Sequence, residues 1–463
     1  MIDRELLERL CARALDRARE TGEPVVTSCV VAGNGAEPLD ALQAMPADGF
    51  RFAWERPKDG FALAAGGAAR RFVAQGARRF HELSERVGTA LRSAITGGPA
   101  AGALPAPFVL GGFSFFDQLD DAKWPGFGPA QLVVPRWMKL RTGQGSHTVL
   151  SAVLGPGDDP ALAAQELLRL GETLAAASRS SGHPVEHSHM QRADEVEGHR
   201  HWLEMVRHAL ERIRAGGLTK VVLARAVELI GGLPSPFRAL RALRAAYPDC
   251  FAFLVDPGAG HTFLGATPER LARLEHGAIL LGALAGSAPR GDRPDADVAL
   301  ERRLLSSETE RGEHAIVVQA ILEAVHPLGG ELNVPERPRV VKLTNVQHLY
   351  TPVSVRPREP VSLISLLARL HPTPAVGGYP RSEALELIRH EERFDRGWYA
   401  GPVGWMNAQG DGEFAVALRS GLLGGGRARL FAGNGIVADS DPEAEYFETQ
   451  LKLQPMLSAL ADE

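Results

Sequence analysis

Two pairs of glutamates at helical spacing are the residues of this sequence best suited to chemistry. Glu310 and Glu313 lie in SSETERGEH, while Glu445 and Glu448 lie in EAEYFETQLK, with Lys452 four residues further on. Residues three or four apart share one face of a helix, so each pair can present two carboxylates in one direction. Their oxygens suit Mg²⁺, which takes one or two protein carboxylates and completes its octahedron with water and substrate oxygens. Taken singly, either pair could instead belong to a solvated helix face.

One lysine and one further glutamate have the sequence context of a base and an acid. Lys220 begins the apolar segment KVVLARAVELI, in which Val222 and Ala224 would share its face of a strand. If that face borders a closed site, desolvation favours the neutral amine, which can act as a general base near pH 7. Glu269 lies in GATPERL, and a carboxyl held in an apolar pocket can donate a proton. A lysine that snorkels from a strand end and a glutamate exposed in a turn are the alternatives.

Other groups could bind the anionic parts of a ligand. Arg419 ends the segment FAVALR, and its planar guanidinium could hold a carboxylate through two parallel hydrogen bonds. The sequence predicts glycine-rich turns at Ala285-Gly286-Ser287 and at Gly433-Asn434-Gly435, whose backbone N–H groups could serve a second anion. His348 in NVQHLYTP is either a hydrogen-bond donor or a core histidine. Together these groups describe a magnesium site for a small dicarboxylate, flanked by one base and one acid.

The elements that must position these residues are most regular in the second half of the chain. The sequence predicts one long helix over residues 297–326, and a terminal helix after Asp441-Pro442, an N-cap followed by a first-turn proline. Long helices between hairpin-spaced strands predict an antiparallel or mixed sheet covered by helices. The predicted strands are residues 25–31, 108–116, 131–140, 220–230, 251–255, 262–265, 278–284 and 415–423. Further helices are predicted at residues 3–20, 69–95 and 160–178, and a linker rich in Ser, His and Gly at residues 177–198.

The composition of the whole chain limits the classes of function. A formal net charge of -5 argues against nucleic acid as the main ligand, and 44% apolar residues are ample for a core. The three cysteines have no regular spacing, which suits a reducing cytoplasm and no disulfide framework. The first residues, MIDRELLERLCARALDRARE, are charged and amphipathic, and predict neither a signal peptide nor a membrane span.

The order of several motifs resembles the chorismate-utilising enzymes, and among them the isochorismate synthases. The resemblance covers about residues 196–460, and GGFSFFD from Gly111 is more loosely similar to the longer, menaquinone-type members. The motifs are KVVLAR from Lys220, LGATPERL from Leu264, LAGSAPRG from Leu284, ETERGEH from Glu308, QHLYTP from Gln347, LHPTPAVGGYP from Leu370, YAGPVGW from Tyr399, VALRSGLL from Val416 and FAGNGIV from Phe431.

The resemblance implies a role for each matching residue. Lys220 matches the lysine that activates water for attack at C2 of chorismate, and Glu269 matches the acid that protonates the departing C4 hydroxyl. The resemblance implies Mg²⁺ as the cofactor. Because the reaction only moves a hydroxyl group, no redox cofactor is expected. The glutamates that match the Mg²⁺ site are Glu313 and Glu448, with Glu310 and Glu445 as their acidic neighbours. The remaining matches lie at the substrate, with Arg419, Gly433 and Lys452 at its carboxylates and His348 and Ala375 along the ring pocket.

Three alternative functions remain open on the sequence. Relatives that add ammonia lack the lysine at Lys220 and carry a TGAPK-like segment where this chain has GGYPR from Gly377, so no amidotransferase subunit is expected. Salicylate synthases keep the lysine but go on to eliminate pyruvate, and they tend towards a Thr-Gly-containing segment there. A non-catalytic chorismate-binding module predicts the loss of at least one of Lys220, Glu269, Glu313 and Glu448, and all four are present. Related enzymes are often monomers.

The resemblance also implies the architecture. It predicts a single large α/β unit in which two antiparallel sheets are sandwiched and flanked by helices. Residues 1–195 would add strands and helices to the same body, and residues 196–463 would form the chorismate-binding core. A separately folding N-terminal domain is the alternative. The long N-terminal half favours menaquinone synthesis over the siderophore or salicylate routes.

Overall fold

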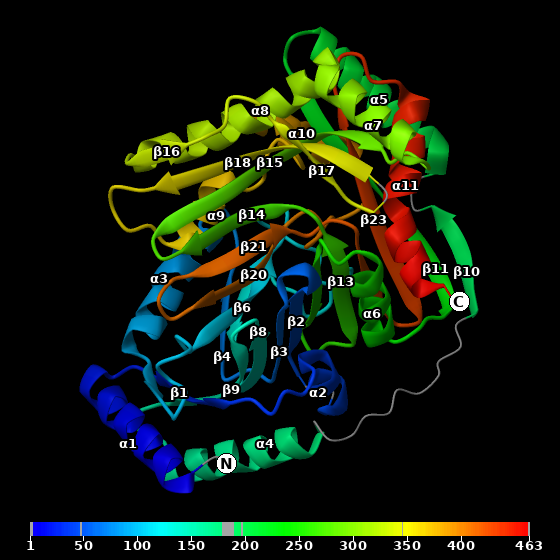
Figure 1. Cartoon of the computed structure of the whole chain (residues 1–463). Coiled ribbons are helices and arrows are strands. Elements are labelled where there is room, and N and C mark those ends of the chain that lie inside the picture. Colours follow the sequence, from blue (N-terminus) through cyan, green and yellow to red (C-terminus); the bar gives the residue numbers. More distant parts are fainter. Residues whose placement is uncertain (1–2, 47–48, 178–188, 196–197, 345, 462–463) are drawn as a thin grey trace.

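The computed structural model describes residues 3–46, 49–177, 189–195, 198–344 and 346–461. These residues form two large β-sheets with helices around them (Figure 1). The predicted fold class, two sandwiched sheets flanked by helices, is confirmed. The helices are α1 (Arg4–Thr21), α2 (Pro38–Ala44), α3 (Arg79–Ser93), α4 (Pro160–Ala177), α5 (Gly198–Arg214), α6 (Pro236–Ala246), α7 (Pro294–Ser306), α8 (Glu308–Val325), α9 (Leu363–Leu370), α10 (Arg381–Glu391) and α11 (Pro442–Leu460), with 3₁₀ turns η1 (Pro57–Asp59) and η2 (His326–Leu328).

The larger sheet has 13 strands within the described residues, and its pairing is antiparallel except between β1 and β5. It joins the two halves of the chain because β12 pairs with β2, placing Asp256 opposite Arg51. In spatial order the strands are β10 (His189–Glu195), β11 (Lys220–Gly232), β23 (Arg427–Ile436), β22 (Ser420–Gly424), β13 (His261–Thr267), β12 (Phe251–Asp256), β2 (Arg51–Arg56), β3 (Phe61–Gly66), β8 (Trp137–Thr142), β9 (Gly145–Leu154), β1 (Val25–Ala32) and β5 (Ile95–Gly97), with β19 (Gly378–Tyr379) also on β11.

The second sheet has 10 strands within the described residues, all paired antiparallel. It too contains strands from both halves of the chain, since β20 pairs with β6 and places Gly404 opposite Gly111. In spatial order the strands are β16 (Glu331–Asn333), β18 (Val346–Arg356), β15 (Ala278–Pro289), β14 (Arg270–Glu275), β21 (Gly412–Val416), β20 (Pro402–Asn407), β6 (Phe108–Phe113), β7 (Ala130–Val134) and β4 (Arg70–Ala74), with β17 (Arg339–Lys342) also on β18.

Two apolar clusters hold the layers together. The larger one contains side chains of both sheets, such as Phe253 of β12 and Phe414 of β21, so it fills the space between them. The second cluster packs α1, α4 and α6 against the larger sheet, with Leu10, Leu167 and Leu240 among its buried residues. On the other side of the molecule α8 lies along β15 and β18 (Figure 1). Within the described ranges, no helix combines the length and the apolar character that crossing a bilayer would need.

Several local predictions were wrong. The strands predicted at residues 131–140 and 415–423 are each two strands, because the chain passes from one sheet to the other between β7 and β8 and between β21 and β22. The helix predicted over residues 297–326 is two helices, because extended Ser307 caps α8 by accepting a hydrogen bond from the N–H of Glu310. The helix predicted at residues 69–95 begins as strand β4 and becomes helical only at α3. The two glycine segments predicted as turns lie inside strands: Gly433–Gly435 belongs to β23, and Gly286, at φ +77°, forms an irregularity in β15.

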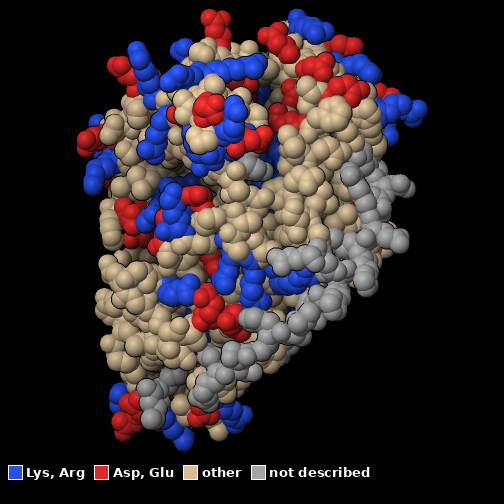
Figure 2. All heavy atoms as spheres, turned by 45° about the vertical axis from the view of Figure 1, so that its right-hand side comes forward, with Lys and Arg blue, Asp and Glu red and all other residues tan. Residues whose placement is uncertain are grey.

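The predicted linker at residues 177–198 lies largely outside the described residues, which leave out 178–188 and 196–197. Its described part includes β10, whose backbone pairs with β11 from Gly232 to Val227. On the face drawn in Figure 2, the basic side chains of the described residues are interspersed with acidic ones. That face therefore does not offer the continuous basic surface that nucleic-acid binding needs.

Candidate active site

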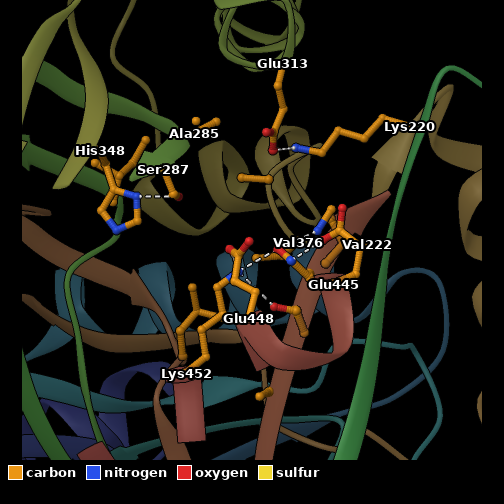
Figure 3. Close-up of a pocket in the computed structure, with 18 of the residues that line it drawn as sticks. Lys220, Val222, Ala285, Ser287, Glu313, His348, Val376, Glu445, Glu448 and Lys452 are labelled. Carbon is orange, nitrogen blue, oxygen red and sulfur yellow. Dashed lines mark hydrogen bonds and ion pairs between the residues drawn. The ribbon is translucent and has the colours of Figure 1, made fainter. Parts of the chain in front are cut away.

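The structure brings every one of the predicted site residues to the wall of a single cavity of about 600 Å³. Its wall is built from the N-terminal half of α8, the first half of α11, and the strands β11, β15 and β23 (Figure 3). The predicted residues found there are Lys220, Glu269, Gly286, Ser287, Glu310, Glu313, His348, Ala375, Arg419, Gly433, Glu445, Glu448 and Lys452.

Lys220 is buried at the start of β11 and faces α8. Its side chain is 1% exposed, and its Nζ donates a hydrogen bond of 2.7 Å to Oε1 of Glu313 (Figure 3). Neighbouring β23 allows this approach because it has Gly435 at the crossing point. A Cβ atom at Gly435 would lie 2.8 Å from Cε of Lys220 and 3.1 Å from Oε1 of Glu313. The glycine is therefore needed for space beside the lysine, and the alternative of a solvent-exposed strand-end lysine is excluded.

Glu269 is a buried carboxyl group whose protonation state is set by its surroundings. The residue is 7% exposed and lies between β13 and β14, where its carbonyl accepts a hydrogen bond from the N–H of Val416. Burial raises its pKa to about 7, although the positive charges of Lys220 and Arg419 act in the opposite direction. A substantial fraction of Glu269 is therefore protonated at neutral pH and able to donate a proton.

The four remaining glutamates converge on the cavity from α8 and α11, and each has a donor, which for Glu313 is Lys220. Glu310 accepts a hydrogen bond of 2.7 Å from the N–H of Ser287, in the irregular part of β15. Glu448 forms an ion pair of 2.8 Å with Lys452, one turn further along α11. Glu445 accepts a hydrogen bond from the side-chain amide of Asn434. Within the described part of the chain, no three His, Cys, Asp or Glu side chains are grouped closely enough to hold a metal ion as they stand.

The electrostatics of these carboxylates nevertheless fit a cation. Burial raises the pKa of Glu310, and the charges of Glu313 and Glu448 raise it further. Burial likewise raises the pKa of Glu445 to about 7, and the same two glutamates contribute to that rise. Burial alone would also raise the pKa of Glu448, but the Lys452 ammonium holds it at about 2. The carboxylates thus repel one another across the cavity, and a hard divalent cation is the ligand that would relieve this repulsion.

His348 and Ser287 form a neutral hydrogen-bonding pair on the opposite wall. Burial lowers the pKa of His348 to about 3, and Arg419 and Lys452 lower it further, so the ring is neutral at pH 7. Its Nδ1 lies 2.8 Å from Oγ of Ser287 (Figure 3), and its buried Nε2 has no hydrogen-bond partner among the described residues. The open nitrogen favours the donor role over that of a satisfied core histidine, because an unpaired buried polar atom is costly.

Arg419 and Lys452 supply positive charge to the wall of the cavity. Arg419 sits between β21 and β22 with φ +49°, a backbone conformation that non-glycine residues rarely adopt. Lys452 donates hydrogen bonds of 2.6 Å to the side-chain oxygen of Asn434 and 3.3 Å to the carbonyl of Gly433. The Lys452 ammonium is therefore held in place before any ligand arrives, which suits the binding of a carboxylate.

Tyr399 and Asn434 also line this cavity, although the sequence analysis assigned no role to their side chains. The ring of Tyr399 lines the cavity, and its hydroxyl would lie 3.1 Å from a Cβ atom at Gly433. Burial raises the pKa of Tyr399 to about 12, so it remains a hydrogen-bond donor. Asn434 connects the two charges of α11 by contacting both Glu445 and Lys452. Tyr399 lies in the motif YAGPVGW and Asn434 in FAGNGIV. Their position as polar residues within these family motifs could have identified them from the sequence.

Comparisons with known proteins give the family of this chain. The model of the family described as "Chorismate binding enzyme" matches residues 13–461. The salicylate biosynthesis isochorismate synthase of Pseudomonas aeruginosa is 39% identical over 455 residues, which cover 97% of this chain and 93% of the relative. Isochorismate synthase MenF of Bacillus subtilis is 34% identical over 462 residues, which cover 97% and 96%. Among solved structures, the menaquinone-specific isochorismate synthase MenF from Escherichia coli is similar with a TM-score of 0.79, at 27% identity, over 97% of this chain and 99% of that one. The chain is a member of the chorismate-binding enzyme family.

Proposed function

We propose that the protein is a magnesium-dependent isochorismate synthase, which converts chorismate to isochorismate. The observation that carries this proposal is the pairing of a buried lysine, Lys220, with a buried, partly protonated carboxyl, Glu269, on the wall of one cavity. Full-length relatives that share 39% and 34% identity bear the name isochorismate synthase, which supports the same activity.

The reaction needs a base and an acid at different carbons of the ring. Water adds at C2 and loses a proton to the side-chain amine of Lys220. The ring double bond shifts, and the C4 hydroxyl leaves as water after accepting the proton of Glu269. One water enters and one leaves, so the reaction is an isomerisation without oxidation or reduction. Arg419 and Lys452 bind the substrate carboxylates, and the Nε2 of His348 donates a hydrogen bond along the ring.

Glu313 and Glu448, with Glu310 and Glu445 beside them, would hold the magnesium ion. When bound, the ion would neutralise the ring carboxylate and fix the ring in register with the base and the acid. The chain itself contributes oxygen donors from two helices, α8 and α11, which approach the cavity from different directions (Figure 3). Glu313 would have to exchange its contact with Lys220 for the ion, which leaves the lysine without its anionic partner.

The product spectrum tests this assignment. Purified protein is incubated with chorismate and Mg²⁺ in the absence of ammonia, and the products are separated. Isochorismate without pyruvate is expected. Salicylate together with pyruvate would identify a salicylate synthase instead. If chorismate binds but is not converted, with or without ammonia, the protein is a non-catalytic binding module.

Replacing Glu313 should expose the magnesium requirement. We expect Glu313→Gln to raise the Mg²⁺ concentration for half-maximal activity by on the order of 10- to 100-fold, because one anionic ligand is lost. The measurement is a magnesium titration at saturating chorismate. Glu308→Gln is the matched control, since Glu308 lies on the same helix but is exposed and outside the cavity. A titration of the Glu313 variant that overlaps the wild type would remove this residue from the metal site.

The protein would work as a cytoplasmic monomer without an amidotransferase partner. Its three cysteines are all buried and unpaired, which agrees with a reducing compartment.

The isochorismate would enter either menaquinone synthesis or a salicylate or siderophore route. The long N-terminal half no longer favours menaquinone, because the relative named for salicylate biosynthesis also aligns along 97% of this chain.

A further inference from the structure

A buried ion pair beneath the cavity has no part in the chemistry described so far. Arg396 follows α10 and lines the cavity, and its side chain is 1% exposed; that of Glu392, its partner, is 2% exposed. The Nε and Nη2 atoms of Arg396 donate hydrogen bonds of 2.8 and 2.5 Å to the two carboxylate oxygens of Glu392. Removing two charges from water is costly, and a buried ion pair is weak support for stability by itself. The contacts of this ion pair instead indicate a role in positioning the segments around it.

The two side chains occupy the open edge of β11. On this edge Lys220 and Val221 pair with β19, and the backbone of β10 pairs from Val227 onwards. Between them, the carbonyl of Val222 accepts a hydrogen bond of 2.7 Å from Nη2 of Arg396. The N–H of Ala224 donates a hydrogen bond of 2.8 Å to Oε1 of Glu392. The guanidinium and the carboxylate thus make the donor and acceptor contacts that another strand would make there.

The same guanidinium reaches the other walls of the cavity. Its Nη1 donates a hydrogen bond of 2.9 Å to the carbonyl of Val376, beside Ala375 in the ring pocket. Its Cζ atom lies 4.2 Å from the ring centroid of Phe115 and 6.0 Å from that of Tyr399. One side chain therefore connects the strand of Lys220, the segment of Val376 and the ring of Tyr399. An arginine suits this position because its planar fork makes several hydrogen bonds in fixed directions.

We propose that Arg396, held by Glu392, is a positioning residue: it closes the edge of β11 and keeps Lys220 in register with the ring pocket. It touches no reacting atom in this proposal, and its effect on turnover passes through the strand that it holds. The inference rests on the proposed function, because it assumes that Lys220 acts on the ring of the substrate.

Arg396→Lys tests the proposal without leaving Glu392 as an unpaired buried charge. A single ammonium cannot contact both carbonyls and both carboxylate oxygens. We expect kcat to fall on the order of 100-fold, the effect of misplacing a reacting group by about 1 Å, while KM for chorismate changes less than about threefold. The matched control is Arg244→Lys, at a second part-buried ion pair with Glu55, whose residues do not line the cavity. It should keep kcat and KM at the wild-type values.

Hydrogen exchange separates positioning from general destabilisation. Both variants are measured at the same number of degrees below their own Tm. Peptides that contain residues 220–226 should then exchange faster in Arg396→Lys than in Arg244→Lys, while exchange in β12 and β13 is unchanged. Unchanged kcat, KM and exchange in a folded Arg396→Lys protein would overturn the proposal. If that variant does not fold, Glu392→Gln, which keeps the acceptor for Ala224, must show the same local exchange and kcat loss. The exchange measurement is independent of the product, so a failed isochorismate assay with wild-type protein would count against the proposed function alone.

Discussion

Lys220→Ala should lose isochorismate formation while the protein still binds chorismate in the presence of Mg²⁺. General base catalysis contributes about 10²- to 10⁴-fold in rate, and no other amine among the described residues occupies the position of Lys220 against α8. The carboxylates that would hold the ion are retained, and the Glu313 side chain is released from its ion pair. The measurements are kcat by product analysis and the Kd for chorismate by calorimetry at saturating Mg²⁺.

Lys139→Ala is a suitable control for this experiment. Lys139 is similarly buried, at 5% exposure, and its Nζ also donates a single hydrogen bond, of 2.8 Å, to the Asn34 side chain. It lies on β8, away from the cavity, so the same loss of a buried amine should leave turnover intact. Near-normal turnover in Lys220→Ala would refute the assignment of the lysine as the base.

Glu269→Gln should remove the proton donor. It should also remove the fall in activity on the alkaline side of the pH profile. The donor must be protonated, and with a pKa of about 7 its protonated fraction falls about tenfold per pH unit above neutrality. Wild-type kcat/KM, which reports the pKa values of the free enzyme, should therefore decline as the pH rises through 7 and 8. An amide cannot donate in this way, so the variant should lose about 10²- to 10⁴-fold in kcat, and its residual rate should no longer decline over this range.

The control for Glu269 is Glu55→Gln. Glu55 is 2% exposed, and burial also raises its pKa, although the Arg244 guanidinium lowers it. Since Glu55 lies outside the cavity, its replacement changes a buried carboxyl without touching the substrate. A Glu269 variant with the same alkaline decline as the wild type would show that another group supplies the proton.

Local sequence patterns were sufficient for most elements around the site. The apolar run after Lys220 forms β11, and Asp441-Pro442 begins α11, with the Asp441 side chain accepting a hydrogen bond from the N–H of Ala444. The break at Ser307 was also visible in principle, because Ser307 precedes Glu310 by three residues, as in a capping box. It was missed because helical periodicity continues on both sides of the serine.

The glycines show where local patterns mislead. Gly433 and Gly435 look like turn residues, but they lie within the C-terminal half of β23. A larger residue would not fit at either position, because neighbouring residues from other elements approach closely. These residues are Leu223 and Tyr399 at Gly433, and Lys220 and Glu313 at Gly435. No short-range rule distinguishes a glycine needed for φ from one needed for close approach.

The sequence by itself determined which residue types are present, which glutamates share a helix face, and, through the order of motifs, the family. Only the tertiary structure decided that Lys220 meets Glu313, that Glu269 is buried enough for a pKa of about 7, and that Arg396 completes the edge of β11. The physical reason is the distance along the chain over which each property is determined. Helical and strand periodicity depend on neighbours within a few residues, whereas protonation and pairing depend on burial and on charges brought together from distant segments.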